Sequence, residues 1–417
     1  MIDLVRLGDA WDEVDVRIGA EVRELLAVSQ SLGVIPKAQI SDAPARADSF
    51  AKYKICEAGD LVLNRFNAYR GAFGRATSSG MVSPDYLVLR PHSDQDGRYL
   101  EYLIRSHYVT SELIKGMGGI GGNDPDSSGF SRMDTHSFHR MPVAKRRLQD
   151  QRAIADYLDR ETVRIDTLIA EQQRLNEMLR ERRFALRVHV AIHGVRPATE
   201  IDSPLPWAAR LPAHWRVVPL TSVARLESGH TPSRSREDWW QDCHIPWVSL
   251  HDVGTMRSAK YLHDSAQRIS DAGVANSSAR VLPAGTVALS RDATVGRAAI
   301  MGVPMATSQH FAAWVCGEPL DPEYLWVLFQ DAMQPFFDSF QNGSTIRTIG
   351  MGDLKAIRIP LPPLDEQRHI VEYTDEHTAK IDRLIAETER FIELSRERRA
   401  ALITAAVTGQ INVREVA

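Results

Sequence analysis

Three short strings contain side chains that could support catalysis, and each lacks part of what its reaction needs. The first, Ser83-Pro84-Asp85-Tyr86, is close to the Asp/Asn/Ser-Pro-Pro-Tyr/Phe loop of methyltransferases that act on DNA amino groups, but its second proline is missing. The Pro84-Asp85 pair is not followed by the Glu-x-Lys of a nuclease. The sequence therefore predicts neither methyl transfer nor phosphodiester hydrolysis at this string.

The other two strings resemble a dinucleotide-binding loop and a metal-binding cluster. Residues 116–121 (GMGGIG) have G-x-G-x-x-G spacing, but they follow a helix-like stretch and no helix follows them, so we interpret them as a loop. Cys243-His244, with His251 and His263 nearby, lacks a second cysteine at zinc-finger spacing. No phosphate-binding G-x-x-x-x-G-K-(S/T) string occurs. We therefore expect no catalytic residue, metal or cofactor in this chain.

The strongest pattern in the sequence is a repeat of one segment half a chain apart. Residues 151–186 read QRAIADYLDRETVRIDTLIAEQQRLNEMLRERRFAL, and residues 367–402 read QRHIVEYTDEHTAKIDRLIAETERFIELSRERRAAL. The two segments align without a gap at an offset of 216 residues (367 − 151). Such a repeat indicates a molecule built as two similar halves.

Each repeated segment is predicted to be one long helix, because it contains no glycine or proline and is rich in Glu, Arg, Gln, Leu and Ala. The first helix is expected over 148–192, ending at Gly194, and the second between Pro363 and Gly409. A rod of 45 residues would be roughly 65–70 Å long. Apolar spacings of three, four and seven residues predict an antiparallel, coiled-coil-like pair. The residues expected to pack the two helices together are Ile154, Ile165, Leu168, Leu175, Ile370, Ile381, Leu384 and Phe391.

A block of mixed strand and helix pattern precedes each helix. Apolar runs at 60–63, 86–89, 245–248 and 286–289 predict strands between turns. The expected fold is therefore mixed α+β, with two α/β blocks separated by two long helices. We place the boundaries at 1–144 (first block), 145–197 (first helix), 198–358 (second block) and 359–417 (second helix and tail).

The bulk composition limits the class of protein. A chain of 417 residues is too long for one core. Its net charge of −4 argues against a protein that coats nucleic acid non-specifically, but it is compatible with a basic surface on a sequence-specific binder. Three widely spaced cysteines fit a reducing cytoplasm. We expect a cytoplasmic protein, since no apolar run is long enough to span a membrane and the N-terminal residues show no export signal.

Several strings resemble the specificity (S) subunits of type I DNA restriction-modification systems. Residues 359–367 (IPLPPLDEQ) lead into the second helix as in that family, and 211–215 (LPAHW) resemble the start of its second half. Residues 57–65 (EAGDLVLNR) resemble a target-recognition domain, as do 68–72 (AYRGA), 83–86 (SPDY) and 342–345 (NGST). The approach to the first helix, 141–148 (MPVAKRRL), departs from the pattern because it keeps one proline and is otherwise basic.

The resemblance implies a non-catalytic subunit that binds double-stranded DNA. Each of its two target-recognition domains would bind one half of a bipartite site, and the antiparallel helix pair would set the spacing. The helices would also bind two methyltransferase subunits, which bring S-adenosylmethionine, and motor-nuclease restriction subunits could join the complex.

Candidate DNA-binding residues follow from side-chain chemistry, because Arg pairs with guanine and Asn with adenine, while Ser and Thr bind phosphates. The alternative for each is a solvated or locally ion-paired surface residue. The candidates crowd a turn in the first block and three loops in the second: Asn64, Arg65, Asn67, Tyr69, Arg70, Thr231, Ser233, Arg234, Arg236, Arg291, Arg297, Ser344, Thr345 and Arg347.

Other interpretations stay open at this point. The basic strings at 180–183 and 396–399 (RERR) are either an exposed, salt-bridged helix face or a contact to a partner or to the DNA backbone. The chain could also be the S-like recognition part of a fused methyltransferase-nuclease, which would need catalytic motifs. A coiled-coil adaptor without a DNA role would not need two α/β blocks.

Overall fold

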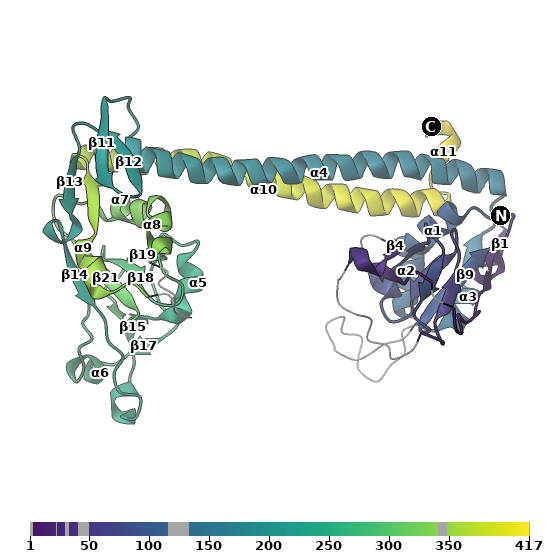
Figure 1. The fold of residues 1–417 in the computed structure, drawn as a ribbon, viewed down its shortest axis with the longest axis horizontal. Coiled ribbons are helices and arrows are strands. Elements are labelled where there is room, and N and C mark those ends of the chain that lie inside the picture. Colours follow the sequence, from purple (N-terminus) through teal and green to yellow (C-terminus); the bar gives the residue numbers. More distant parts are fainter. Residues whose placement is uncertain are drawn as a thin grey trace. The chain divides into compact units, whose positions relative to one another are not determined.

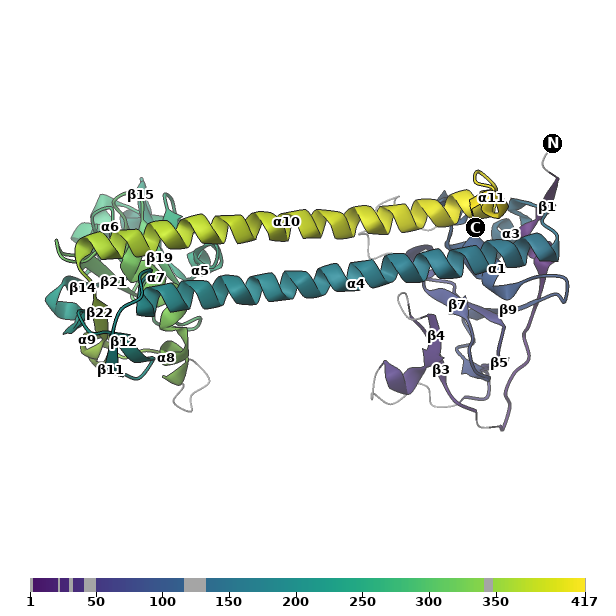
Figure 2. The same cartoon turned by 90° about the horizontal axis from the view of Figure 1, so that it is seen from above.

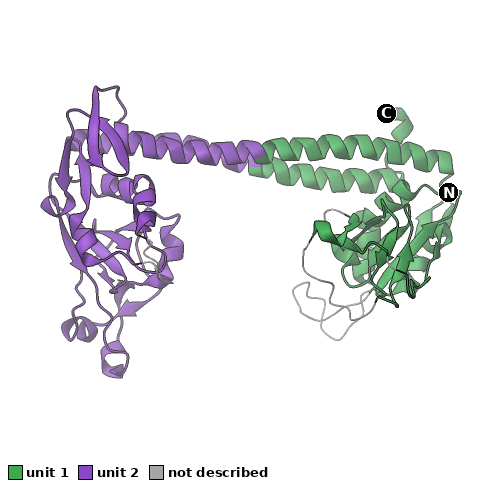
Figure 3. Cartoon of the chain, viewed as in Figure 1, with its two compact units in different colours: residues 1–173, 389–417 green, residues 174–388 purple. Residues whose placement is uncertain are grey.

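The computed structural model describes residues 3–21, 23–29, 33–40, 50–115, 133–340 and 348–416. The chain forms two compact units, the first from residues 1–173 with 389–417 and the second from residues 174–388 (Figure 3). Each unit therefore contains one block and half of each long helix. No helix in the described ranges is both long enough and apolar enough to cross a membrane.

Unit 1 is built around an antiparallel four-stranded sheet in the order β2-β9-β6-β7. In β6, one of the two inner strands, residues 61–63 are buried on both faces of the sheet, which explains their unbroken apolar run. Three strand pairs, β1-β10, β3-β4 and β5-β8, surround the sheet. The strands are β1 (Leu4–Arg6), β2 (Trp11–Glu13), β3 (Leu26–Ser29), β4 (Gly33–Pro36), β5 (Lys54–Cys56), β6 (Leu61–Asn64), β7 (Phe73–Arg75), β8 (Gly80–Val82), β9 (Tyr86–Pro91) and β10 (Pro142–Ala144).

The helices of unit 1 pack on this sheet together with the ends of both long helices. Ile154 and Leu158 near the start of α4 (Leu148–His193) share one core with Ile403 and Val407 near the end of α10 (Leu364–Thr408). Burial of these four side chains fixes both helix ends to the same domain core. The shorter helices of the unit are α1 (Gly97–Arg105), α2 (His107–Lys115), α3 (Thr135–Arg140) and α11 (Val413–Val416).

Unit 2 contains a five-stranded sheet in the order β14-β21-β18-β19-β16 and a three-stranded sheet in the order β17-β15-β20. Strand β13 pairs with β22, as β1 pairs with β10 in unit 1. The strands are β11 (Glu200–Leu205), β12 (Ala208–Pro212), β13 (Arg216–Pro219), β14 (Ala224–Ser228), β15 (Ile245–Val248), β16 (Tyr261–Leu262), β17 (Arg268–Ile269), β18 (Val287–Ser290), β19 (Ala298–Met301), β20 (Ala306–Thr307), β21 (Phe311–Cys316) and β22 (Arg358–Leu361).

The core of unit 2 mirrors that of unit 1. Val190 and Ile192 at the end of α4 share it with Ile370 near the start of α10. The β11-β12 hairpin, which the sequence does not predict, contributes Leu205 and Leu211 to the same core. The short helices are α5 (Val253–Met256), α6 (Asp271–Ala275), α7 (Pro322–Val327), α8 (Gln334–Ser339) and α9 (Met351–Ala356), and a π-helical turn spans Leu328–Ala332.

The two long helices run antiparallel and lie side by side (Figures 1 and 2). In unit 1, Arg399 forms an ion pair with Asp166 across the helices at 2.9 Å, and in unit 2 Arg183 does so with Asp382. The two ion pairs are equivalent under the repeat, since both members are displaced by 216 residues (399 − 183 and 382 − 166). The mixed α+β fold with two long, packed helices is thus confirmed.

The residues between the helices differ in part from the expected set. Ile165 and Ile381 are buried there and Leu175 is partly buried, but Leu168, Leu384 and Phe391 are 38%, 49% and 44% exposed. In α10 the buried helix-packing residues are instead Ile385 and Ile392, each one position after an expected residue. A heptad repeat can step four residues from Ile381, to Ile385, whereas the expected pattern stepped three, to Leu384. Ile154 and Ile370 lie in the domain cores rather than between the helices.

Candidate nucleic-acid interface

In unit 1 the predicted site lies in the loop between β6 and β7. The Asn64 side chain accepts a hydrogen bond from the Phe66 amide (3.1 Å), which folds the chain into an Asx turn. The Arg65 carbonyl accepts from the Met133 amide (2.9 Å), and its guanidinium donates to Thr135 Oγ1 (2.8 Å). Asn64 and Arg65 therefore shape the loop and attach it to the segment before α3.

The tip of the same loop presents the remaining candidates. Gly71 has a φ of +87°, a conformation that closes the turn and favours glycine. The guanidinium carbon of Arg70 lies 5.2 Å from the centre of the Tyr69 ring, and Arg70 is exposed. Asn67 is partly exposed beside them. These three side chains lie on one loop after a buried strand and are at least partly exposed, so a ligand can contact them.

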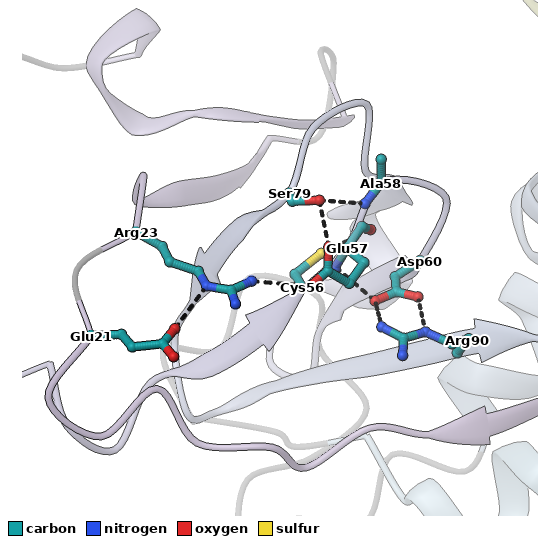
Figure 4. Close-up of polar contacts among 8 residues, drawn as sticks. All are labelled: Glu21, Arg23, Cys56, Glu57, Ala58, Asp60, Ser79 and Arg90. Atoms are coloured by element: carbon teal, nitrogen blue, oxygen red, sulfur yellow. Dashed lines mark hydrogen bonds and ion pairs between the residues drawn. The ribbon is translucent and has the colours of Figure 1, made fainter.

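A network of charged residues holds the turn that precedes β6 (Figure 4). Arg90 donates two hydrogen bonds to the buried carboxylate of Asp60, both 2.9 Å long. Asp60 also accepts from the Glu57 amide at 2.8 Å, while the Glu57 carboxylate accepts from Ser79 and Arg23. Because the carboxylates are satisfied within the network, it supports the loop and does not form an independent binding site.

The buried thiol in this region is unsuited to nucleophilic chemistry. Burial, with the neighbouring carboxylates of Asp60 and Glu57, raises the pKa of Cys56 to about 12. In unit 2, burial likewise raises the pKa of Cys316 to about 12. Both thiols therefore stay protonated at neutral pH, and a protonated thiol is a poor nucleophile. Over the described ranges, no three His, Cys, Asp or Glu side chains gather where they could hold a metal ion.

Unit 2 repeats the loop attachment seen in unit 1. The Arg291 carbonyl accepts from the Ile349 amide (2.8 Å), as Arg65 accepts from Met133, and the Arg291 Nε donates back to the Ile349 carbonyl (3.1 Å). The positive charge of Arg297, which is partly buried, opposes the rise in the pKa of Asp331 that burial causes. Arg291 thus has structural contacts, and Ser344, Thr345 and Arg347 lie outside the described residues.

A chain of hydrogen bonds connects this loop to the segment 231–236. Thr231 donates to Gln309 (2.5 Å), the Gln309 amide contacts the His310 ring (3.3 Å), and His310 is 2.9 Å from Asp292. Ala293, next to Asp292, has a φ of +61°, which is rare for a residue with a side chain and is often found at functional sites. The structure therefore brings two of the three predicted loops of unit 2 together.

Gln309, His310 and Asp292 were missed from the sequence. For Gln309 and His310, the sequence offers one indication, a short polar run, Ser308-Gln309-His310, between two buried strands. Gln309 is exposed, and a glutamine amide can form two hydrogen bonds with adenine. We therefore add Gln309 to the candidate contacts.

The last predicted segment contains Ser233, Arg234 and Arg236, all of which are exposed. The two arginines differ in what they contact. Arg236 donates two hydrogen bonds to Asp238 (3.0 and 2.8 Å), whereas Arg234 lies over the ring of Trp240. Arg236 also lies over a ring, 4.9 Å from the centre of Trp239, so both arginines stack on a tryptophan and Arg236 is in addition paired with a carboxylate.

Comparison with known proteins connects this arrangement to one family. Residues 212–393 match the family model for the type I restriction modification DNA specificity domain. The chain is 28% identical over 162 residues to the MjaIX specificity subunit of Methanocaldococcus jannaschii, covering 39% of this chain and 37% of that protein. It is 25% identical over 181 residues to the EcoR124I/EcoR124II specificity subunit of Escherichia coli, covering 42% of this chain and 44% of that protein. These alignments span less than half the length of either relative.

Two solved structures share the fold along nearly the whole chain. A chain from a structure of complex assembly and conformational transition of the type I R-M system has a TM-score of 0.73 at 19% identity, covering 98% of both chains. The HsdS subunit from Thermoanaerobacter tengcongensis has a TM-score of 0.62 at 19% identity, covering 98% of this chain and 97% of that one. The solved structures thus share the fold, and residues 212–393 match the DNA specificity domain of type I restriction-modification systems.

Proposed function

We propose that this chain is a specificity subunit of a type I restriction-modification system and that it binds double-stranded DNA through both units, each of which reads one half of a bipartite target. The repeated loop attachment carries the proposal: Arg65–Met133 in unit 1 and Arg291–Ile349 in unit 2 hold corresponding loops in the same way. The side chains on those loops differ, with Asn67 and Arg70 in one unit and Gln309 in the other. A shared scaffold that presents different hydrogen-bonding groups suits two different half-sites.

The long helices would set the distance between the half-sites and bind the partner subunits. Exposed apolar side chains support the second role, since Leu168 and Leu384 occupy equivalent repeat positions, as do Met178 and Leu394 (384 − 168 and 394 − 178, both 216). Exposed apolar side chains that recur on a helix surface are typical of an interface. Two copies of one partner, the methyltransferase, could therefore bind equivalent surfaces.

The chemical steps would belong to these partners. The methyltransferase subunits would bring S-adenosylmethionine, and motor-nuclease restriction subunits could join the complex. This chain would contribute target recognition, which needs positioned hydrogen-bonding groups but neither a nucleophile nor a metal.

An exchange of the first block tests whether the two units read independently. Residues 1–144 are replaced by the corresponding block of another specificity subunit, and methylated sites are mapped in cells that also express the methyltransferase. We expect one half of the bipartite motif to change while the other half and the gap stay the same. A change in both halves would show that the units do not read independently.

A further inference from the structure

We infer that Arg234 is a specificity-determining residue of unit 2 and that it reads a guanine. The inference rests on the proposed function and assigns a base and a residue to it. The first observation is that the loop around Arg234 is rigidly supported. Trp240 Nε1 donates to the Ser233 carbonyl (3.0 Å), and the Ser270 hydroxyl donates to the Trp239 carbonyl (2.6 Å).

A second tryptophan, Trp247, packs against Trp240. Trp247 on β15 is buried, and its Nε1 donates to the His230 carbonyl (3.2 Å). Its ring contacts that of Trp240 edge-on, with 5.9 Å between the ring centres. Both rings are thus held by hydrogen bonds to the loop that carries Arg234, and neither is free to turn away.

Arg234 lies on this aromatic support. Its guanidinium carbon is 3.8 Å from the centre of the Trp240 ring and 5.7 Å from that of Trp247. Stacking restrains a side chain that would otherwise lose much conformational entropy on binding. The residue is nevertheless exposed, so its N–H groups can reach a ligand.

Three other exposed arginines of unit 2 form ion pairs with carboxylates. Arg236 pairs with Asp238, Arg268 with Asp264 at 2.8 Å and Arg280 with Glu227 at 3.1 Å. Across the ranges that the structure describes, no carboxylate lies within ion-pair distance of Arg234. An arginine that stacks on a ring and has no carboxylate partner keeps its hydrogen-bonding fork available.

The position of the loop connects this arginine to the rest of the candidate interface. Thr231, three residues earlier, donates to Gln309, which belongs to the hydrogen-bonded chain beside the Arg291 loop. A planar guanidinium donates two parallel hydrogen bonds to the O6 and N7 atoms of guanine in the major groove. A phosphate contact would need charge but would gain less from a fixed plane.

The test measures methylation of duplexes by the complex of this chain with its methyltransferase, using wild-type protein and the variants R234A, R234K and R268A. The substrates carry the mapped bipartite motif, or that motif with one base pair of one half-site changed. We expect R234A to reduce discrimination at a single G·C pair in the half-site of unit 2 by roughly 5- to 150-fold. R234K should restore little of it, and R268A, which removes an exposed arginine paired with Asp264, should behave like the wild type.

The outcomes separate the inference from the proposed function. If R234A weakens methylation equally on all duplexes and R234K restores it, the residue contacts phosphate through its charge and the inference fails. If R234A retains full discrimination, Arg234 does not read a base, although the bipartite function stands. If the wild-type complex itself shows no bipartite motif, the proposed function fails first. Thermal unfolding of each variant identifies a loss that comes from misfolding.

Discussion

The glutamine that opens each repeat should contribute strongly to the stability of its own unit. Gln367 is 0% exposed, and its carbonyl oxygen accepts a hydrogen bond from the Asp321 amide (2.8 Å). Its amide group donates to the carbonyls of Pro319 and Pro362, both at 2.9 Å. One side chain thereby joins the start of α10 to the residue that caps α7.

The substitution Gln367→Ala would leave one N–H and two C=O groups without partners in a buried site. An unsatisfied buried polar group costs about 1–3 kcal/mol, so the expected loss is roughly 3–6 kcal/mol if the carbonyls find partial compensation. Gln151 makes the equivalent contacts to Asp96 (2.8 Å) and Arg146 (3.0 Å), but its third partner is the side chain of Gln95. A side chain can turn to water, so Gln151→Ala should cost less, roughly 2–4 kcal/mol.

Hydrogen exchange with mass spectrometry at increasing urea concentration resolves the two units. Gln367→Ala should lower the opening free energy of α7, and Gln151→Ala that of α1. The control is Arg368→Ala, which removes an exposed guanidinium 3.7 Å from Asp321 and should cost less than about 1 kcal/mol. The reasoning is refuted if Gln367→Ala destabilises α7 no more than Arg368→Ala does.

Two further predictions concern a buried carboxyl and an exposed leucine. Burial raises the pKa of Asp331 to about 6, although Arg187, Arg183 and Arg297 oppose that shift. Because the unfolded state releases this proton at lower pH, unit 2 should lose about 3 kcal/mol of stability as the pH rises from 4 to 6. Asp331→Asn should flatten that slope in urea unfolding, and an unchanged slope would exclude Asp331 as its source. Leu384→Glu should change stability by less than about 0.5 kcal/mol, since the side chain is half exposed, yet weaken binding of the methyltransferase at least tenfold in calorimetry; unchanged binding would move the interface elsewhere.

The parts of the fold that follow from local pattern could be predicted from the sequence. The first helix was expected over 148–192 and is observed at Leu148–His193, because an uninterrupted run of helix-forming residues has few alternatives. The strand expected at 86–89 is observed at Tyr86–Pro91 for a similar reason, a short apolar run between turns. The helix-packing positions were placed less well, since Leu384 and Ile385 are both apolar and only the partner helix selects one.

The candidate site depended on contacts that sequence patterns do not contain. Arg65 and Arg291 were candidates because arginine binds DNA, but their partners Met133 and Ile349 lie more than fifty residues away. The support of Arg234 likewise requires Trp247 on another strand. Side-chain type therefore suggested the clusters, whereas tertiary contacts show which of their residues also hold the fold together.

The most direct test of bipartite DNA reading is a comparison of genome-wide methylation between cells with and without this gene, both of which express the methyltransferase partner. In cells without the gene, methylation should disappear at one motif, made of two short half-sites around a non-specific gap, and stay unchanged elsewhere. An unchanged methylation pattern, or the loss of a motif without a gap, would contradict bipartite reading.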